Sequence, residues 1–264
     1  MACCLAPEGD LSRIPAAYQK IQDRTKTWIS RDQTVYVETE GHRQAVRQLD
    51  QRGAVVITGP EGSGKSALGH ALLRHYWRHH AHTPLDVRDH EEWCQHVDVR
   101  KGRQVVLLDD VFGSEEFSYT SYKTWARDLF HMQDSVRSSA FLVVITIRAD
   151  VMEEMDLKCN FRDLFRHGPV LDLGSAECFR ESEKLEMLRK HVENRDGASV
   201  DENKLRDMIV TATLKTGVGF PLQCMILAKD CEAGDEQARE ITHKQKALQF
   251  TQKRARLQED GQAL

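Results

Sequence analysis

The sequence lacks the features that would mark a membrane-spanning or secreted protein. Its longest apolar run, Ala140 to Ile147, is far too short to span a bilayer. The first ten residues, MACCLAPEGD, have neither the basic region nor the long apolar region of a signal peptide. We therefore expect no membrane span and a cytoplasmic location. No internal repeat or low-complexity block is visible.

A strong charge of either sign is also lacking. The 37 lysines and arginines stand against 41 aspartates and glutamates, which gives a net charge of −4. Such a balance creates no field that would draw the molecule to nucleic acid or to an anionic membrane. Neither is therefore expected as a partner, which leaves a protein partner or self-association.

Covalent and metal chemistry have no clear signature. The seven cysteines lack both zinc spacing and a disulfide framework, so we expect reduced, mostly buried thiols. There is no G-x-S-x-G motif and no cysteine paired with a histidine in a recognisable motif. His75 and His79 stand four residues apart, but surface histidines at a helix end explain them better than a metal site.

What the sequence does contain is an alternation of strand-like and helix-like segments. At 264 residues, with 40% hydrophobic residues, the chain can bury one sizeable core and a small second one. The pattern predicts an α/β fold, a three-layer α/β/α core with a mostly parallel sheet, followed by a small all-α subdomain. The predicted divisions are a helical arm (1–33), the core (34–174), the helical subdomain (175–235) and a polar basic tail (236–264).

The stretch VVITGPEGSGKSAL, residues 55–68, carries the clearest functional pattern. It has the order G-x-x-x-x-G-K-[ST] after a β-branched run and before a helix-period segment. Glycines let the backbone aim several N–H groups at one phosphate, and the following helix adds its positive dipole end. Lys65 would reach the β and γ phosphates, and the Ser66 hydroxyl would bind Mg²⁺. The predicted nucleotide-binding residues here are Gly59, Pro60, Glu61, Gly62, Ser63, Gly64, Lys65, Ser66 and Ala67.

An acidic pair ends a second strand-like run, VVLLDDVFG. Asp109 is placed to complete the shell of Mg²⁺ with Ser66, and Asp110 to act as the base or to position the attacking water. The next apolar strand ends at Arg148, which makes this residue a candidate γ-phosphate sensor, because carboxyl ends of parallel strands converge. A surface arginine leading into a helix is the alternative for Arg148. The predicted catalytic residues are therefore Lys65, Asp110 and Arg148.

The motifs VVITGPEGSGKS, VVLLDDVFG, VVITIR and GFPL follow one another in that order. In this the chain resembles the STAND class of P-loop NTPases, signal-transducing switches related to the NB-ARC proteins, and within it the novel STAND NTPase 3 group. The resemblance covers about residues 28–232. It implies ATP as the nucleotide, base contacts from Val35 to Thr39, and a helical lid in which Pro221 of GFPL approaches the nucleotide.

The function that we expect is an ATP-binding, Mg²⁺-dependent switch that slowly hydrolyses ATP to ADP and phosphate. STAND switches usually carry further modules, whereas this chain ends about 30 residues after the lid, so we expect a fragment or a stand-alone nucleotide module. Two alternatives stay open: a P-loop small-molecule kinase, and a scaffold that binds ATP without hydrolysing it. The chain has no second acceptor-binding motif and no guanine-specific N-K-x-D signature.

Overall fold

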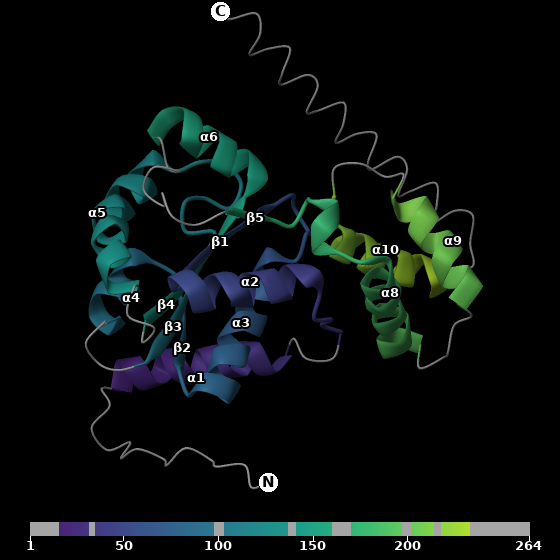
Figure 1. The fold of residues 1–264 in the computed structure, drawn as a ribbon, viewed down its shortest axis with the longest axis horizontal. Coiled ribbons are helices and arrows are strands. Elements are labelled where there is room, and N and C mark those ends of the chain that lie inside the picture. The colour runs from purple at the N-terminus through teal and green to yellow at the C-terminus, as the bar shows by residue number, and fades with distance from the viewer. Residues whose placement is uncertain are drawn as a thin grey trace, which may run out of the picture.

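A parallel β-sheet organises the first two thirds of the chain. The computed structural model describes residues 16–31, 35–97, 103–136, 141–159, 170–196, 202–213 and 218–232. Within these ranges five strands, all paired in parallel, form one sheet in the order β2-β3-β4-β1-β5 (Figure 1). The strands are β1 (Ala54–Gly59), β2 (Thr83–Val87), β3 (Gln104–Asp109), β4 (Phe141–Arg148) and β5 (Val170–Asp172).

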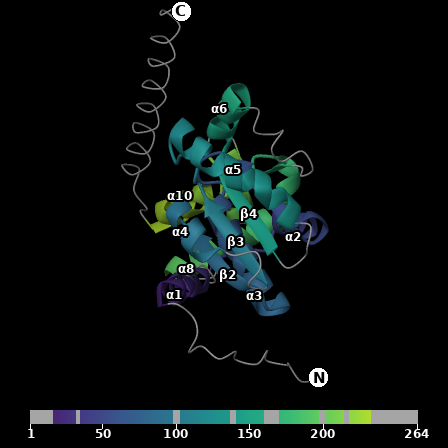
Figure 2. The same cartoon turned by 90° about the vertical axis from the view of Figure 1, so that its left-hand side faces the viewer.

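Helices cover both faces of this sheet, because its strands are apolar on both sides. In β1, Val56 belongs to the apolar cluster that includes residues of α4, α5 and α6, whereas Val55 and Ile57 belong to the cluster that includes residues of α2 and α3. Figure 2 is turned so that the side bearing α4, α5 and α6 faces the viewer. The helices of this part are α1 (Ala16–Arg31), α2 (Glu40–Arg52), α3 (Lys65–His80), α4 (His90–His96), α5 (Tyr119–Val136) and α6 (Ala149–Cys159).

Helix α1 lies along the edge strand β2. Its Thr25 hydroxyl accepts a hydrogen bond from the Asp86 N–H at 3.0 Å, and Arg24 donates to the Asp86 carbonyl at 2.7 Å. The edge of a sheet leaves backbone groups that invite pairing with another chain. Side chains of α1 satisfy two of these groups in β2.

A separate group of helices follows the last strand and lies beside the sheet (Figure 1). Its core includes Leu188, Val192, Leu205 and Cys224, which are all buried. The elements are the 3-10 helix η2 (Ala176–Cys178), α8 (Glu181–Asp196), α9 (Glu202–Thr213) and α10 (Phe220–Glu232). We call α8, α9 and α10 the helical subdomain.

The predicted α/β class with its P-loop NTPase type of core is confirmed, and the sheet is parallel throughout the described strands. The divisions of the chain stay predictions, and the predicted tail (236–264) lies outside the described residues, as do residues 1–15 and 32–33 of the predicted arm. None of the helices that the structure describes is both long and apolar enough to cross a membrane. The described cysteines form no disulfide; Cys178 and Cys224 are buried, whereas Cys94 is exposed.

Candidate functional site

The glycine loop, residues 59–66, connects β1 to α3 at the carboxyl edge of the sheet. Gly62 and Gly64 have φ values of 71° and 86°, a left-handed conformation that residues with a Cβ rarely adopt. The Ser63 N–H donates to the Pro60 carbonyl at 3.2 Å and closes the turn. Gly64 is the N-cap of α3 and offers no side-chain cap, so the first N–H groups of the helix stay available to an anion.

Lys65 opens α3 and lies beneath the loop. Its side chain is buried, and Nζ donates to the carbonyl oxygens of Gly59 and Pro60, each at 3.2 Å. Burial lowers the pKa of this ammonium group, while the nearby Asp110 carboxylate opposes the change. The loop therefore holds one buried cation directly below the curled backbone.

Three oxygen-bearing side chains meet beside Lys65. The Asp109 Oδ1 atom accepts hydrogen bonds from the Ser66 hydroxyl at 3.0 Å and from the Thr146 hydroxyl at 2.5 Å. Asp109 ends β3 and pairs in register with Thr146 of β4, so the sheet itself sets this contact. The predicted pair of Mg²⁺ ligands, Ser66 and Asp109, is thus brought together.

Asp110 follows directly and has an unusual backbone. Its φ of 48° lies in the left-handed region, and its N–H is held by the Thr146 carbonyl at 3.3 Å and hydroxyl at 3.1 Å. Burial, and next the charge of Asp109, raise the pKa of the Asp110 carboxyl to about 6, against the pull of Lys65 and Arg148. Its Oδ1 atom is buried without a hydrogen-bond partner among the described residues.

Arg148 ends β4 next to Gly59 of β1. Its guanidinium forms two hydrogen bonds to the Asp150 carboxylate, at 3.0 and 2.7 Å, and a third to the Ser114 carbonyl at 3.0 Å. The Asp150 hydrogen bond is also the main reason that the pKa of Arg148 is raised. In the structure the Arg148 guanidinium is bound to Asp150. Its assignment as a phosphate sensor stays a prediction.

The start of α10 packs directly on the glycine loop. The N–H groups of Gly219 and Leu222 donate to the carbonyls of Glu61 and Gly62, at 2.9 and 3.1 Å. A Cβ on Gly219 would lie 2.2 Å from the backbone nitrogen of Ser63, so only glycine permits this approach. The helical subdomain therefore contacts the loop through backbone, on the side where the loop's carbonyl groups point outward.

A cavity of about 290 Å³ lies where the glycine loop, the segment 35–39 and the helical subdomain meet. Most of its lining is apolar, as is usual for sites that take a flat organic group. Lys190 of α8 donates to the Tyr36 carbonyl at 2.9 Å and so ties the segment to the subdomain. The lining residues are Val35, Tyr36, Val37, Thr39, Gly62, Ser63, Gly64, Ala67, Leu68, Leu173, Phe179, Met187, His191, Pro221, Leu222 and Met225.

The sequence predicted most parts of this arrangement but not three of them. The glycine loop, the acidic pair, the segment 35–39 and Pro221 all lie around one region. Thr146 was missed, although a threonine inside an otherwise apolar strand was a visible signal. The pairing of Arg148 with Asp150 was missed too, and the spacing R-x-D was its only sign in the sequence. The third feature missed was the approach of the Gly219 backbone to the glycine loop.

Comparison with known proteins gives one family. The family model described as Novel STAND NTPase 3 matches residues 36–194, more than half of the chain. No curated protein sequence matches the chain.

Three solved structures are similar to the chain at low identity. Domain III of the Thermotoga maritima replication initiation protein DnaA is 18% identical, with a TM-score of 0.42 over 72% of this chain and 90% of that one. C. elegans PCH-2 is 14% identical, with a TM-score of 0.43 over 89% and 72%. The Walker-type ATPase paby2304 of Pyrococcus abyssi is 13% identical, with a TM-score of 0.45 over 84% and 76%.

Proposed function

The chain belongs to the novel STAND NTPase 3 family, and from that premise we propose that it is an ATP-binding, Mg²⁺-dependent NTPase that works as a slow nucleotide-controlled switch. The family implies nucleotide binding and hydrolysis, typically with Mg²⁺. The choice of ATP, the slow rate, the signalling role and a cytoplasmic location are our proposals.

The residues around the glycine loop fit a nucleotide. Gly62 and Gly64 adopt the backbone conformation that turns N–H groups toward an anion, and α3 begins at Lys65 with its dipole pointing the same way. The Ser63 hydroxyl oxygen is buried without a partner among the described residues, and a ligand bound at the loop would supply one. The apolar cavity beside the loop suits a base, with Val35 to Thr39 as its predicted contacts.

The oxygen donors beside Lys65 fit a magnesium ion. Mg²⁺ takes one or two protein oxygens and keeps several waters, and the Ser66 hydroxyl and Asp109 carboxylate are 3.0 Å apart. These two residues would hold the ion, with Thr146 orienting the carboxylate. When bound, Mg²⁺ neutralises charge on the β and γ phosphates.

We assign three residues to the chemistry of hydrolysis. Lys65 would stabilise charge on the phosphates once its Nζ exchanges the Gly59 and Pro60 carbonyls for phosphate oxygens. Asp110 would orient the attacking water through its unpartnered Oδ1 atom. Arg148 would sense the γ phosphate after release from Asp150, and this exchange of partners is one reason to expect slow turnover.

The observation that carries the switch proposal is the contact of α10 with the loop. Gly219 and Leu222 hydrogen-bond to the same stretch of backbone that would surround the phosphates, and Pro221 lines the cavity beside it. A nucleotide that reshapes the loop must therefore also change the free energy of docking of α10. By linkage, the position of the helical subdomain then depends on which nucleotide is bound. A protein partner or a second copy of the chain could bind one position more tightly than the other.

A direct test combines binding, turnover and shape. We expect ATP with Mg²⁺ to raise the melting temperature, to be hydrolysed slowly, and to give an X-ray scattering profile different from those of the apo and ADP states. Lys65→Ala should weaken ATP binding by about ten- to hundredfold, since it removes charge-assisted hydrogen bonds to phosphate. The exposed Lys158→Ala on α6 is the matched control and should behave like the parent.

The alternatives make different predictions in the same experiment. A large thermal shift with no released phosphate would replace the switch with a non-hydrolysing scaffold. A phosphorylated small molecule in place of free phosphate would identify a kinase. Identical scattering profiles in the apo, ADP and ATP-analogue states would contradict the switch itself.

A further inference from the structure

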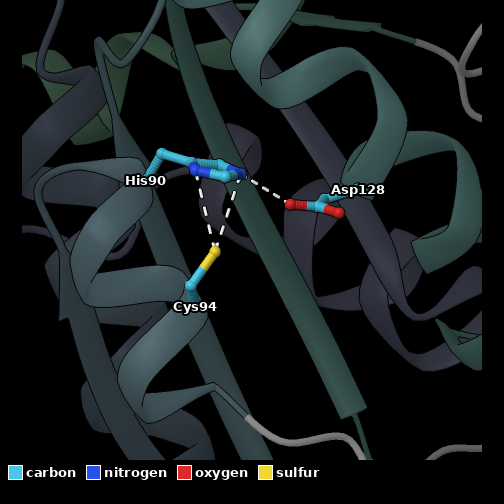
Figure 3. A group of neighbouring side chains, drawn as sticks. All are labelled: His90, Cys94 and Asp128. Carbon is cyan, nitrogen blue, oxygen red and sulfur yellow. Dashed lines mark hydrogen bonds and ion pairs between the residues drawn. The ribbon is translucent and has the colours of Figure 1, made fainter.

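Three side chains with metal-binding chemistry meet on the face of the sheet that α4 and α5 cover. They are His90 and Cys94 of α4 and Asp128 of α5 (Figure 3). His90 Nε2 lies 2.6 Å from Asp128 Oδ2, and Cys94 Sγ lies 3.7 and 3.8 Å from the two ring nitrogens of His90. One ligand atom from each residue falls within 4.8 Å of the others. None of the three lines the cavity beside the glycine loop.

From these contacts we propose that His90, Cys94 and Asp128 form a binding site for Zn²⁺, with three protein ligands and one open coordination position that water fills. His90 and Cys94 are four residues apart on a helix, so their side chains share one face. Asp128 reaches the same point from the neighbouring helix. An imidazole, a thiolate and a carboxylate are all recognised zinc ligands, and three of them with an open position form the usual catalytic type of zinc site.

The distances are close to those that tetrahedral zinc requires. Bond lengths of about 2.3 Å to sulfur and about 2.0 Å to nitrogen or oxygen place S and N about 3.5 Å apart, and N and O about 3.3 Å apart. The observed Sγ–Nε2 separation of 3.8 Å is about 0.3 Å too long and the Nε2–Oδ2 separation of 2.6 Å about 0.7 Å too short, while Sγ lies within 4.8 Å of a carboxylate oxygen, so small side-chain rotations would admit the ion. The thiol of Cys94 is exposed, so rotation about its single side-chain torsion can bring sulfur toward the metal.

The surroundings hold the two helices in place for such a site. The His90 ring packs edge-on against Trp125 at 5.1 Å, and Trp125, which is buried, packs in turn against Trp93. Asp89 caps α4 by accepting a hydrogen bond from the Glu92 N–H at 2.8 Å. The start of α4, where His90 stands, is therefore fixed on its apolar side and at its cap, which lowers the entropic cost of binding.

The ligand set also selects the kind of metal. Mg²⁺ and Ca²⁺ prefer oxygen ligands only, whereas a site with thiolate and imidazole favours zinc and its softer neighbours. A nucleophilic cysteine–histidine pair is the competing use of these groups. That use would need sulfur along the lone pair of one ring nitrogen, whereas sulfur is about equally far from both, at 3.7 and 3.8 Å; the metal titration below separates the two uses.

The cluster is distinct from the histidines that the sequence made prominent. His75 and His79 have ring centroids 5.1 Å apart, but the group of close ligand atoms found among the described residues is the one on α4 and α5. Sequence spacing could not show it, because its third ligand comes from another helix. Zinc here would link α4 to α5, whose first residue comes nine positions after Asp110.

The experiment uses the full chain after chelator treatment, titrated with Zn²⁺ and, as a spectroscopic substitute, with Co²⁺. We expect one metal ion per chain and, with Co²⁺, a thiolate-to-metal charge-transfer band together with the visible bands of tetrahedral coordination. Cys94→Ser should abolish the charge-transfer band and weaken Zn²⁺ binding by at least about tenfold. Asp128→Asn should keep the band but also weaken binding.

Matched variants make the result decisive. Cys159→Ser, at another described thiol, and His79→Gln, in the histidine cluster, should both bind metal like the parent. Circular dichroism of each variant separates loss of a ligand from loss of fold, and the exposure of Cys94 makes its replacement mild. A charge-transfer band that survives Cys94→Ser, or binding that is lost in His79→Gln, would overturn the proposal.

Discussion

At the scale of single residues, Asp110 stands out because its backbone and its carboxyl group are both held in unfavourable states. A φ of 48° costs free energy in a residue other than glycine. Two sets of hydrogen bonds hold Asp110 in this conformation: its N–H donates to Thr146, and its carbonyl accepts from the Gly113 N–H. The carboxyl is buried near Asp109, which raises its pKa to about 6. A strained backbone conformation and a shifted pKa at one position are typical of a functional residue.

The raised pKa predicts that Asp110→Asn stabilises the protein at neutral pH. The folded carboxyl binds its proton more tightly than the unfolded one, whose pKa is 3.8, so ionisation of Asp110 costs stability as pH rises through this window. Above about pH 6 we expect the variant to gain about 1 kcal/mol, after the shift is discounted for partial exposure to solvent. The gain should shrink as pH falls from 6 toward 4 in urea unfolding of the nucleotide-free protein.

Asp150→Asn is the control of opposite sign. Burial acts to raise the pKa of Asp150, but its hydrogen bonds and the charge of Arg148 outweigh burial and lower it. Its carboxylate therefore contributes stability above the unfolded pKa of 3.8, and loses that contribution as pH falls through the lower folded pKa. The variant should be less stable than the parent at neutral pH. An Asp110→Asn curve parallel to the parent's at all pH values would refute the assignment.

Residue roles were predictable from the sequence only where they are local. The glycine loop is recognisable in the sequence because its glycines, its lysine and its hydroxyl residue all lie within eight positions. Thr146 orients Asp109 across two strands, and that contact depends on the register of β3 with β4. Register is set by packing of the whole sheet, so the sequence displayed a threonine inside an apolar strand but not the residue that it contacts.

At the scale of elements, the sheet was predictable and the docking of α10 was not. Unbroken apolar runs predicted β3 and β4, since strands of a parallel sheet are buried on both faces. The motif GFPL drew attention to Pro221, which does line the cavity. The backbone of Gly219 also approaches the loop closely, however, and glycine has no side chain that a sequence pattern could reveal.

Gly219→Ala should separate α10 from the glycine loop. A Cβ at this position would lie 2.2 Å from the Ser63 nitrogen and Cα, and backbone atoms cannot move aside as a flexible side chain can. Overpacking of this kind costs about 1–3 kcal/mol. We expect faster amide hydrogen exchange at the start of α10, unchanged exchange in β1, β3 and β4, and ATP binding weaker by roughly ten- to hundredfold.

The exposed Lys229→Ala on the same helix is the control for this substitution and should leave both readouts unchanged. If Gly219→Ala binds ATP like the parent while α10 exchanges faster, contact of α10 with the loop is not coupled to the nucleotide. That result would count against the switch while leaving the loop as a nucleotide site.

At the scale of the whole molecule, a second connection joins the core to the helical subdomain away from the loop. Glu183 of α8 is buried, and its Oε2 atom accepts hydrogen bonds from the N–H groups of Glu40 at 3.0 Å and Arg180 at 2.9 Å. Its Oε1 atom pairs with Arg43 of α2. One carboxylate thus fixes the start of α2 against the start of α8. The sequence showed two compositionally different regions, but such a contact across 140 residues left no pattern in it.

Glu183→Ala should therefore loosen the helical subdomain as a unit. The change leaves the N–H groups of Glu40 and Arg180 without their acceptor, at a cost of about 1–3 kcal/mol. We expect a lower urea midpoint and faster hydrogen exchange throughout α8 and α10. ATP binding should weaken as well, because the cavity is built from both parts of the molecule.

Glu181→Ala is the matched control, since this glutamate stands on the same helix, is largely exposed and pairs only with the nearby Lys184 in the contacts described. Exposed pairs of this kind contribute at most about 1 kcal/mol, so its stability should stay close to the parent's. If both substitutions lower the urea midpoint equally, the effect belongs to helix α8 itself. If only Glu183→Ala loosens the subdomain, the α2–α8 contact is what holds the helical subdomain against the core. We would then expect the subdomain to pivot about this contact when the nucleotide changes.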